Sequence, residues 1–517
     1  MTATRTFVDE IGAHAARAPH APALVAPGAV VSYGELFERV ERLARLLIAY
    51  GVGPEQVCAI ALEHGVDAIV AMAAVSRAGG AFLTLDVGLP QQRLAAMVAS
   101  GRARFLVTTD PLVERLALRV PGPTVLIDQP VAPVAEPTGT VAQPPGIAAN
   151  SLAYVSHTSG STGTPNAVLI EHRGLASYLR FVVRDYGLGP QTVALQLAPL
   201  GYDASIRDSF APLAAGGRLV LVDRAALLRV NEFAATVAEF GVNTILSATP
   251  SFLTFLAQHE ALADRLGGLR VVVCSGESLR PFLASGGRRM LTGRLVNQYG
   301  PTECTMTSTR FEVPGEPETA VDPVGTPIDG VRVHLLDGEL TPVPVGTVGE
   351  VYIGGVGVAR GYCADPARTA ERFLADPFGP PGARLYRTGD LARQRPDGTL
   401  EYLGRGDRQL KIRGYRVDPA EIEGALLTHP AVTAAVVTAD ADSQGRTYLI
   451  AHLTGRLAEV TDAALRVHLS ATLPPYMMPR RFTRLDRIPT TSTGKADRGA
   501  LGALGARGQA QAAVRTS

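Results

Sequence analysis

The amino-acid sequence predicts an α/β fold: a large N-terminal domain of α/β sheet layers with a β-rich subdomain, and a small α+β C-terminal domain. Three observations support this division. The first half of the 517 residues alternates stretches of helical periodicity with short runs of β-branched residues. From Val331 onward strand and turn patterns dominate, and after Asp407 a compact mixture of strands and helices begins. The early alternation is typical of helices that cover a sheet.

The elements expected in the first half follow in order. A predicted helix that ends at Gly51 has one apolar face, formed by Leu36, Val40, Leu43 and Leu47. Residues 121–145 are rich in Pro and Gly and show neither helical nor strand periodicity, so we expect a surface connection within the large domain. Further on, apolar β-branched runs predict buried parallel strands at residues 218–223, 243–247 and 270–274.

The β-rich part and the C-terminal unit have their own signals. Val331, Val333 and Leu335 alternate as in a strand, and a Pro-Asp-Gly turn at 396–398 separates two further strand-like runs. The first helix of the C-terminal unit is predicted from Asp418 as N-cap, Pro419 at its first position and Glu421 at the capping-box position.

The change of pattern near residues 405–407 marks a domain boundary. It predicts domains at residues 1–406 and 407–517. Residues 502–517 contain few large apolar side chains, and we expect a frayed tail there.

Composition excludes several classes of protein. Lys and Arg total 49 against 48 Asp and Glu, a net charge of +1 with no basic run, so neither nucleic acid nor an anionic membrane is an expected partner. No apolar run approaches the ~20 residues that cross a bilayer, and acidic residues interrupt the N-terminus before any signal-peptide core. The four cysteines are far apart without C-x-x-C spacing, which argues against a zinc site and fits a cytoplasmic protein.

A glycine-rich loop is the first functional motif. Residues 158–167 read TSGSTGTPNA and follow a strand-like run at 152–156, so small residues and hydroxyls gather at a strand-to-loop corner. Such a corner suits a phosphate group, because several backbone N–H groups are accessible there. A flexible surface turn is the alternative explanation for this short pattern. Its spacing does not match the G-x-x-x-x-G-K-[ST] motif of P-loop nucleotidases.

Eight motifs follow one another along the chain: SYGEL at 32–36, the loop at 158–167, NQYGPTE at 297–303, GEVYIGG at 349–355, YRTGDL at 386–391, GRGDRQLKIRGYR at 404–416, LPPYMMP at 473–479 and TGKADR at 493–498. With these motifs in this order, the chain resembles the adenylate-forming superfamily, and within it the amino-acid-activating adenylation domains of nonribosomal peptide synthetases. One departure is notable. Asn166 and Ala167 stand where the family usually has Lys-Gly, which removes a cation near the β- and γ-phosphates.

The resemblance implies an ATP-dependent, AMP-forming ligase. A substrate carboxylate attacks the α-phosphate of ATP, pyrophosphate leaves, and the acyl group then passes to a thiol. Because charge develops on phosphate oxygens, cations and donors are needed there. The resemblance places Thr302 on the α-phosphate and Glu303 on Mg²⁺, which prefers oxygen ligands. It assigns ATP binding to Thr158, Ser159, Gly160, Ser161, Thr162, Gly163, Gly276, Glu277, Asn297, Tyr299, Gly300, Asp390, Tyr402 and Arg405.

The resemblance also makes the C-terminal domain mobile. It assigns Lys495 as the catalytic cation that bridges the substrate carboxylate and the α-phosphate, and Asp407 as the hinge about which the domain rotates. In the second orientation a different stretch would face the active site and line the path of the thiol. Its residues are Lys411, Gly414 and Tyr415.

A substrate pocket follows from the same comparison. Asp203 matches the position at which members of this family carry a carboxylate that pairs with the substrate's amino group. The lining assigned by the resemblance is polar: Asp203, Ala204, Arg207, Ser247, Val272, Cys274, Gln298, Met306 and Thr307. A bulky apolar substrate would leave buried polar groups unpaired, at about 1–3 kcal/mol for each neutral group. An amino acid with a polar, most of all a carboxylate-bearing, side chain is therefore expected. The alternative is that Arg207 pairs with Asp208 or Glu303, or reaches solvent past the small Ala204, and a small or hydroxylated amino acid would then fit.

The expected partners are an amino acid and a separate holo carrier protein, with a small MbtH-like helper protein as a further candidate. The chain ends soon after Lys495, which predicts a free-standing enzyme that loads its carrier in trans. Two alternatives remain. An acyl- or aryl-CoA ligase of the superfamily would keep the nucleotide motifs without needing Asp203. A degenerate nucleotide-binding regulator would fit the lysine missing at Asn166.

Overall fold

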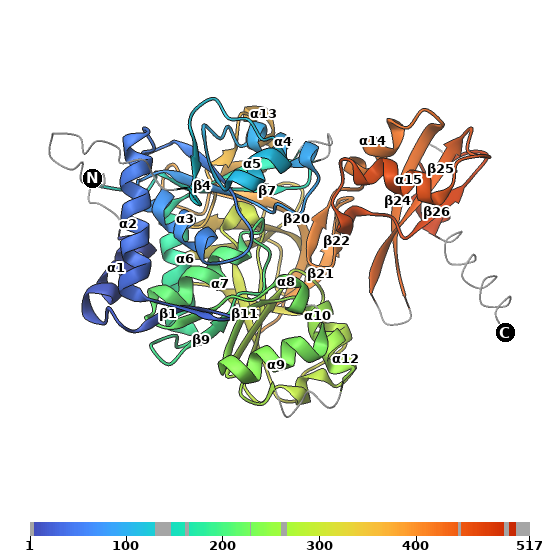
Figure 1. Ribbon diagram of the computed structural model, residues 1–517. Helices are drawn as coiled ribbons and strands as arrows, with labels where there is room; N and C mark the ends of the chain where they lie inside the picture. The colour runs from blue at the N-terminus through green and yellow to red at the C-terminus, as the bar shows by residue number, and fades with distance from the viewer. Residues whose placement is uncertain are drawn as a thin grey trace. The chain divides into compact units, whose positions relative to one another are not determined.

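The computed structural model describes residues 5–129, 146–160, 165–227, 229–259, 266–442, 446–490 and 496–502 (Figure 1). Contacts between residues divide the chain into two units. The first comprises Met1–Val87, Met97–His157 and Ala167–Gly406. The second comprises Gly88–Ala96, Thr158–Asn166 and Asp407–Ser517, so two short segments of the N-terminal part group with the C-terminal part.

The first unit contains a sheet whose described strands are arranged in the order β18-β8-β7-β4-β3-β5-β6. The pairs among β3 to β7 are parallel, and β18 runs antiparallel to β8 at its edge. The bounds are β3 Val57–Ala61, β4 Ala81–Leu85, β5 Phe105–Thr108, β6 Thr124–Leu126, β7 Leu152–Thr158, β8 Asn166–Glu171 and β18 Gly361–Tyr362. The short strand β6 lies in the segment 121–145 that was expected to lack strands, because its three residues pair with β5. Residues 130–145 are outside the described part.

A larger sheet follows the order β16-β17-β20-β21-β15-β14-β13-β12-β11-β9-β10-β1-β2 among the described strands, with β19 beside β20. The predicted parallel strands are confirmed as β10, β11 and β12. The predicted β-rich subdomain after Val331 supplies β16, β17, β20 and β21, and these strands continue this same sheet through β15 and β14. The bounds are β1 Pro22–Ala26, β2 Ala29–Ser32, β9 Val193–Leu195, β10 Arg218–Val220, β11 Thr244–Ala248, β12 Val271–Ser275, β13 Arg294–Tyr299, β14 Thr309–Val313, β15 Pro323–Pro327, β16 Val331–Leu336, β17 Val348–Gly355, β19 Phe373–Ala375, β20 Arg384–Gln394 and β21 Leu400–Arg405.

Helices cover these sheets, as the alternating pattern predicted. The predicted helix is α2, Tyr33–Ala49, which starts at Ser32 with a reciprocal capping box to Glu35 and buries Leu36, Val40 and Leu47. The other bounds before Gly406 are α1 Phe7–Arg17, α3 Val66–Arg77, α4 Gln91–Ser100, α5 Asp110–Leu116, α6 His172–Asp185, α7 Ala204–Ala214, α8 Arg224–Leu227, α9 Val230–Phe240, α10 Pro250–Ala257, α12 Arg280–Ala284 and α13 Pro366–Arg372. Two 3₁₀ turns, η2 Gly287–Met290 and η3 Thr302–Cys304, lie beside β13 in the sequence.

The second unit has its own apolar core, which includes Val417, Ile422, Leu453 and Leu465. A hairpin and a three-stranded sheet form its strands: β22 Leu410–Ile412, β23 Tyr415–Val417, β24 Val432–Ala441, β25 Thr447–Gly455 and β26 Arg481–Arg484. Its helical elements are α14 Pro419–Leu427, α15 Asp462–Ser470 and η4 Pro475–Met477.

The start of α14 agrees only in part with the predicted cap. Asp418 is the N-cap and accepts from the backbone N–H of Ala420 at 3.0 Å, as predicted. Glu421 does not complete the capping box. Its Oε1 instead accepts from Nη1 of Arg93 at 2.5 Å, and both side chains are buried. A buried guanidinium is a stronger partner for this carboxylate than the N-cap backbone amide.

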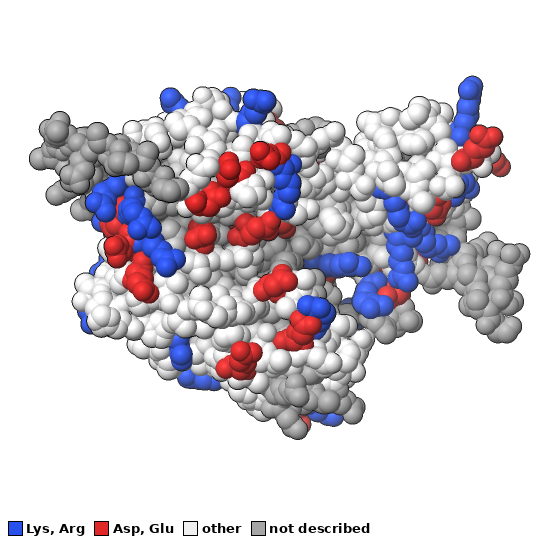
Figure 2. All heavy atoms as spheres, viewed as in Figure 1, with Lys and Arg blue, Asp and Glu red and all other residues white. Residues whose placement is uncertain are grey.

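Charge is mixed over the surface of the first unit. Figure 2 shows Arg interspersed with Asp and Glu on the visible face of that unit. Among the described residues, no helix has both the length and the apolar character needed to cross a membrane.

Candidate active site

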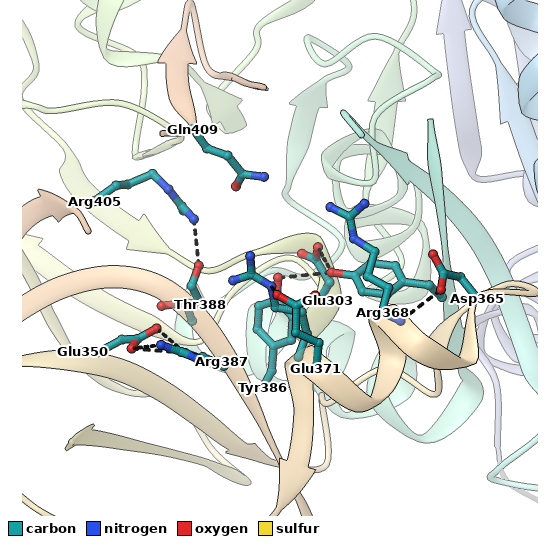
Figure 3. A network of polar contacts seen from close by, with 12 residues as sticks. Glu303, Glu350, Asp365, Arg368, Glu371, Tyr386, Arg387, Thr388, Arg405 and Gln409 are labelled. Carbon is teal, nitrogen blue, oxygen red and sulfur yellow. Dashed lines mark hydrogen bonds and ion pairs between the residues drawn. The ribbon is translucent and has the colours of Figure 1, made fainter. Parts of the chain in front are cut away.

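Asp390 lies at the centre of a group of side chains that are predicted to bind the nucleotide. It lies on β20 with 2% of its surface exposed. Its Oδ2 accepts from the Tyr299 hydroxyl at 2.7 Å, and its Oδ1 accepts from Arg405 at 2.8 Å and from the Tyr402 hydroxyl at 3.3 Å. Arg405 also donates to the carbonyl of Thr388 at 2.8 Å (Figure 3). Three other predicted nucleotide-binding side chains therefore meet at the Asp390 carboxylate.

The other predicted nucleotide positions at the ends of β12 and β13 are shaped by backbone constraints. Gly276 has φ +91°, a conformation that residues with a side chain rarely adopt, and a Cβ on Gly300 would lie 2.6 Å from the backbone nitrogen of Ser308. Glu277 accepts from the backbone of α10 at 2.8 Å. Asn297 is buried and donates from Nδ2 to a backbone carbonyl at 2.9 Å.

The phosphate loop begins at Thr158, the last residue of β7. Asn166 donates from Nδ2 to the carbonyl of Ser159 at 2.9 Å, so this side chain links the two sides of the loop. The Ser159 hydroxyl donates to the carbonyl of Arg416 at 2.8 Å within the second unit. Gly160 follows Ser159, and the predicted residues Ser161, Thr162 and Gly163 lie outside the described part of the chain.

Glu303 and Thr302 lie together on η3. Glu303 is 1% exposed, and its Oε1 accepts from the hydroxyl of Tyr362 at 2.9 Å. The Thr302 side chain lies close enough to the carboxyl group of Asp203 to oppose the rise of its pKa, so the predicted phosphate-contacting turn adjoins the predicted substrate pocket.

The donor set around Glu303 fits magnesium bound together with a nucleotide. The described residues contain no group of three or more His, Cys, Asp or Glu side chains that would form a protein cage for a metal ion. Mg²⁺ retains several waters and is usually held by one or two carboxylates together with substrate phosphates. A single buried carboxylate beside a turn that is predicted to contact phosphate meets that requirement.

The predicted pocket is built around α7. Asp203 precedes this helix and Arg207 lies one turn later, a spacing that places both on one face. Oδ2 of Asp203 and Nε of Arg207 are buried without a hydrogen-bond partner. Burial raises the pKa of Asp203, although the Thr302 side chain and the charge of Arg207 oppose the shift. A cation bound at Asp203 would stabilise its ionised form.

Arg207 is 1% exposed and is held by neutral groups. Nη1 donates to the Tyr178 hydroxyl at 3.0 Å and to Oε1 of Gln298, and Nη2 donates to Oγ of Ser247 at 2.8 Å. The hydroxyl of Ser247 donates in turn to Oδ1 of Asp208, so it lies between the two charged side chains. No described carboxylate is recorded in an ion pair with Arg207.

The remaining pocket residues come from neighbouring elements. Val272 and Cys274 are buried on β12, beside β11, which carries Ser247. Thr307 donates to Oε1 of Gln298 at 3.0 Å, and Met306 has φ +69° in the turn before it. Ala204 opens α7, and its carbonyl accepts from Ser247 at 3.3 Å. The structure thus brings most of the predicted lining residues into one hydrogen-bonded group.

The residues predicted to act in thiol transfer lie on the β22–β23 hairpin of the second unit. Lys411 is on β22, Gly414 has φ +82° in the turn, and the ring of Tyr415 stacks on Tyr476 with centroids 3.7 Å apart. Asp407, the predicted hinge, accepts from the backbone N–H of Gln409 at 3.1 Å. The predicted catalytic Lys495 lies outside the described residues.

Sequence reasoning missed three tyrosines. The Tyr178 hydroxyl accepts from Arg207, and the Tyr186 hydroxyl accepts from Nε2 of Gln298. The Tyr362 hydroxyl donates to Glu303. Tyr178 lies on the buried face of the amphipathic helix α6, where its spacing resembles that of any core residue. Nothing in the local pattern distinguishes these tyrosines from packing residues.

Comparison with known families places these motifs in context. Residues 11–363 match the AMP-binding enzyme family, and residues 421–495 match the AMP-binding enzyme C-terminal domain. The chain is 41% identical over 498 residues to phosphinothricin tripeptide synthetase PhsB of Streptomyces viridochromogenes, which covers 95% of this chain and 41% of the relative. It is 37% identical over 484 residues to a dimodular nonribosomal peptide synthase of Bacillus subtilis, covering 93% of this chain and 20% of the relative. The chain therefore spans well under half the length of these relatives.

Solved structures with the same architecture include two enzymes. An artificially fused adenylation–PCP di-domain, NpsA-ThdA from Klebsiella oxytoca, aligns with a TM-score of 0.81 and 25% identity over 94% of this chain and 95% of that one. The amide bond synthetase McbA from Marinactinospora thermotolerans aligns with a TM-score of 0.84 and 25% identity, over 97% of this chain and 99% of that one.

Proposed function

The chain belongs to the AMP-binding enzyme family as an adenylation domain of the adenylate-forming superfamily, an AMP-forming ligase, and from this premise we propose that it activates an amino acid with a polar, most of all acidic, side chain. The observation that carries the proposal is a pair of buried atoms without hydrogen-bond partners: Oδ2 of Asp203, which precedes α7, and Nε of Arg207 on α7. One is an acceptor suited to an ammonium group, and the other is a donor suited to a carboxylate.

In the proposed reaction, a carboxylate oxygen of the amino acid attacks the α-phosphorus of ATP. The new O–P bond forms as the bond to the β-phosphate oxygen breaks, and pyrophosphate leaves. Thr302 donates to the α-phosphate, and Lys495 places its ammonium between the two reacting anions. Glu303 would hold Mg²⁺, which would supply positive charge to the phosphates. These groups act on charge that develops in the transition state.

Asp203 determines whether the substrate is an amino acid or an unaminated acid. A buried carboxylate repels the carboxylic acid substrate of an acyl-CoA ligase unless a cation lies between them. With an ammonium group bound, the same carboxylate gains a charge-assisted hydrogen bond and satisfies Oδ2. This contact favours the amino acid over the acyl- or aryl-CoA ligase alternative.

The direct experiment compares amino acids with their deaminated counterparts in substrate-dependent ATP–pyrophosphate exchange. Glutamate should support exchange and glutarate should not, and aspartate and succinate should differ in the same way. Exchange driven equally by glutarate would assign the chain to the acyl-CoA ligases. The absence of exchange with every acid would instead support a nucleotide-binding regulator.

We further propose that the acyl group passes to the phosphopantetheine thiol of a holo carrier protein acting in trans. The thiolate sulfur attacks the carbonyl carbon, a C–S bond forms, and the C–O bond to AMP breaks. The likeness to an adenylation–PCP di-domain supports this acceptor, whereas the likeness to an amide bond synthetase makes a free amine the alternative. Incubating the adenylate with holo carrier or with amines separates the two, and adding an MbtH-like protein tests the need for a helper.

We place the reaction in the cytoplasm. The four cysteines, Cys58, Cys274, Cys304 and Cys363, are free thiols in the structure, and a reducing compartment preserves them.

Replacing Asp407 with proline should separate the two half-reactions. Proline fixes φ near −65°, so a hinge at this position would lose the freedom that domain rotation needs. We expect thiol loading to fall more than adenylation, because loading would need the domain rotation that the proline hinders. Pyrophosphate exchange and radiolabelled carrier loading measure the two rates.

Asp407→Ala is the matched control for this change, because it also removes the carboxylate that accepts from Gln409 but leaves φ free. It should retain both half-reactions. Equal losses in both half-reactions of Asp407→Pro would indicate misfolding and remove support for a hinge at this residue.

A further inference from the structure

The segment between β17 and α13 forms hydrogen bonds with Glu303 and with the chain next to it. The backbone N–H of Ala359 donates to the carbonyl of Glu303 at 2.9 Å. Two residues after Glu303, the hydroxyl of Thr305 donates to the carbonyl of Gly357 at 2.7 Å. The hydroxyl of Tyr362 then reaches the Glu303 carboxylate itself at 2.9 Å. The backbone and the carboxylate of Glu303 are thus positioned by one short stretch of chain.

This segment is fixed from its other side. Arg384 donates from Nη1 to the carbonyl of Arg360 at 2.8 Å and from Nη2 to that of Ala359 at 2.7 Å. The backbone N–H of Tyr362 donates to Oγ1 of Thr369 at 3.0 Å. These bonds hold the backbone from which the Tyr362 side chain projects.

The tyrosine ring is also restrained. The guanidinium of Arg368 lies over it, 5.4 Å from the centroid, and the ring of Phe373 packs edge-on at 5.5 Å. A ring held on two sides presents its hydroxyl in one direction, and little conformational entropy is lost when the hydroxyl bonds Glu303.

Burial makes this hydrogen bond strong. Glu303 is 1% exposed and Tyr362 is 7% exposed, so water is largely excluded from the contact. A hydrogen bond to an ionised acceptor is about twice as strong as one between neutral groups. Partners of this kind fix the orientation of a ligating carboxylate and alter its affinity for the metal ion.

We infer that Tyr362 is a positioning residue for Glu303, and that its hydroxyl orients the carboxylate for Mg²⁺ bound with ATP. The inference rests on the proposed role of Glu303 as the magnesium ligand. Tyr362 touches neither substrate nor reacting atoms in this assignment. It acts through Glu303, and its effect should therefore depend on Mg²⁺.

The test is Tyr362→Phe, which removes the hydroxyl and keeps the ring. Equilibrium binding of ATP to the full chain is measured by calorimetry without amino acid, once with excess Mg²⁺ and once with EDTA. We expect the Kd for ATP to rise about tenfold with Mg²⁺, the lower end of the effect of losing such a partner, and to stay unchanged in EDTA. The Mg²⁺ concentration at half-maximal pyrophosphate exchange should rise in parallel.

Tyr352→Phe is the matched control. The hydroxyl of Tyr352 also donates to a glutamate, Oε2 of Glu350 at 3.4 Å, and the residue is 2% exposed. It lies on β17 and contacts none of the predicted ATP-binding residues through this bond. The control should leave ATP binding unchanged under both conditions.

Two outcomes would overturn the inference. Tyr362→Phe could bind ATP normally with Mg²⁺, or it could lose affinity equally with Mg²⁺ and EDTA, which would indicate a general structural role. If Tyr362→Phe does not fold, Thr369→Val serves instead, because it removes the acceptor of the Tyr362 backbone N–H while leaving the hydroxyl in place. It should shift the Mg²⁺-dependent Kd in the same direction by a smaller factor, and no shift would count against the inference.

Glu303→Gln separates this inference from the assignment beneath it. Glu303→Gln could abolish the gain in ATP affinity that Mg²⁺ provides, while Tyr362→Phe leaves that gain unchanged. This result would keep Glu303 as the magnesium ligand and refute the role of Tyr362. An unchanged Mg²⁺ effect in Glu303→Gln would refute the magnesium assignment, and the inference with it. In the double variant Tyr362→Phe should add little to Glu303→Gln, because both changes act on one carboxylate.

Discussion

Lys495→Ala should lower the rate of adenylate formation by about 10²–10³-fold, the loss typical of removing one electrostatic donor from a transition state. The ammonium is proposed to lie between the substrate carboxylate and the α-phosphate, two anions that must approach each other. Amino-acid-dependent pyrophosphate exchange measures the effect. The Kd for ATP should change little, because the proposed role concerns the reacting atoms.

The sequence offers a matched control, since Lys411 and Lys495 are the only lysines among the 517 residues. Lys411→Ala should retain pyrophosphate exchange and lower carrier loading, because Lys411 is assigned to the thiol-transfer stretch. Lys495→Ala should lower pyrophosphate exchange but retain carrier loading when a preformed aminoacyl-adenylate is supplied. Near-normal exchange in Lys495→Ala would remove this residue from the catalytic assignment.

Arg207→Ala should cost about 3–5 kcal/mol in kcat/KM for an acidic amino acid, roughly two to three orders of magnitude, by analogy with removing one partner of a buried ion pair. Nε of Arg207 is buried without a partner, and the rest of the guanidinium is held by Tyr178, Gln298 and Ser247. A side-chain carboxylate of the substrate would supply the missing acceptor. Activity towards small neutral amino acids should hold or rise.

A purely structural role for Arg207 predicts a different result. Arg207→Ala would then lower activity with all amino acids by similar factors and would lower the melting temperature. Arg207→Lys distinguishes the two roles even if the alanine variant is unstable, because lysine keeps the charge but cannot make the same forked set of hydrogen bonds. It should retain part of the preference for acidic substrates, and an unchanged ranking of substrates in both variants would contradict the specificity role.

The sequence predicted the parts of this fold that depend on local pattern. Strands β10, β11 and β12 are short β-branched runs, and α2 carries its capping box and apolar face within 18 residues of sequence. Glu421 shows the limit of this approach. Its position matches a capping box, but its carboxylate pairs with Arg93, 328 residues away in the sequence. A tertiary partner outcompetes a local one, and local pattern does not reveal it.

In the candidate site, the sequence likewise allowed prediction only of residues that lie in recognisable motifs. Motif residues such as Asp390, Tyr299 and Arg405 could be named from the family resemblance, and the structure shows the contacts among them. Tyr178 and Tyr362 could not be named, because their roles depend on hydroxyl contacts between elements 59 to 120 residues apart in sequence. Such contacts require the packed fold.

The most direct test of the central claim is amino-acid-dependent ATP–pyrophosphate exchange by the full chain across a panel of all twenty proteinogenic amino acids, with β-amino acids added. The account predicts that an amino acid with an acidic or other polar side chain gives the highest kcat/KM, because it satisfies Asp203 and Arg207 together. A panel in which leucine or phenylalanine exceeds every acidic and polar amino acid would contradict it.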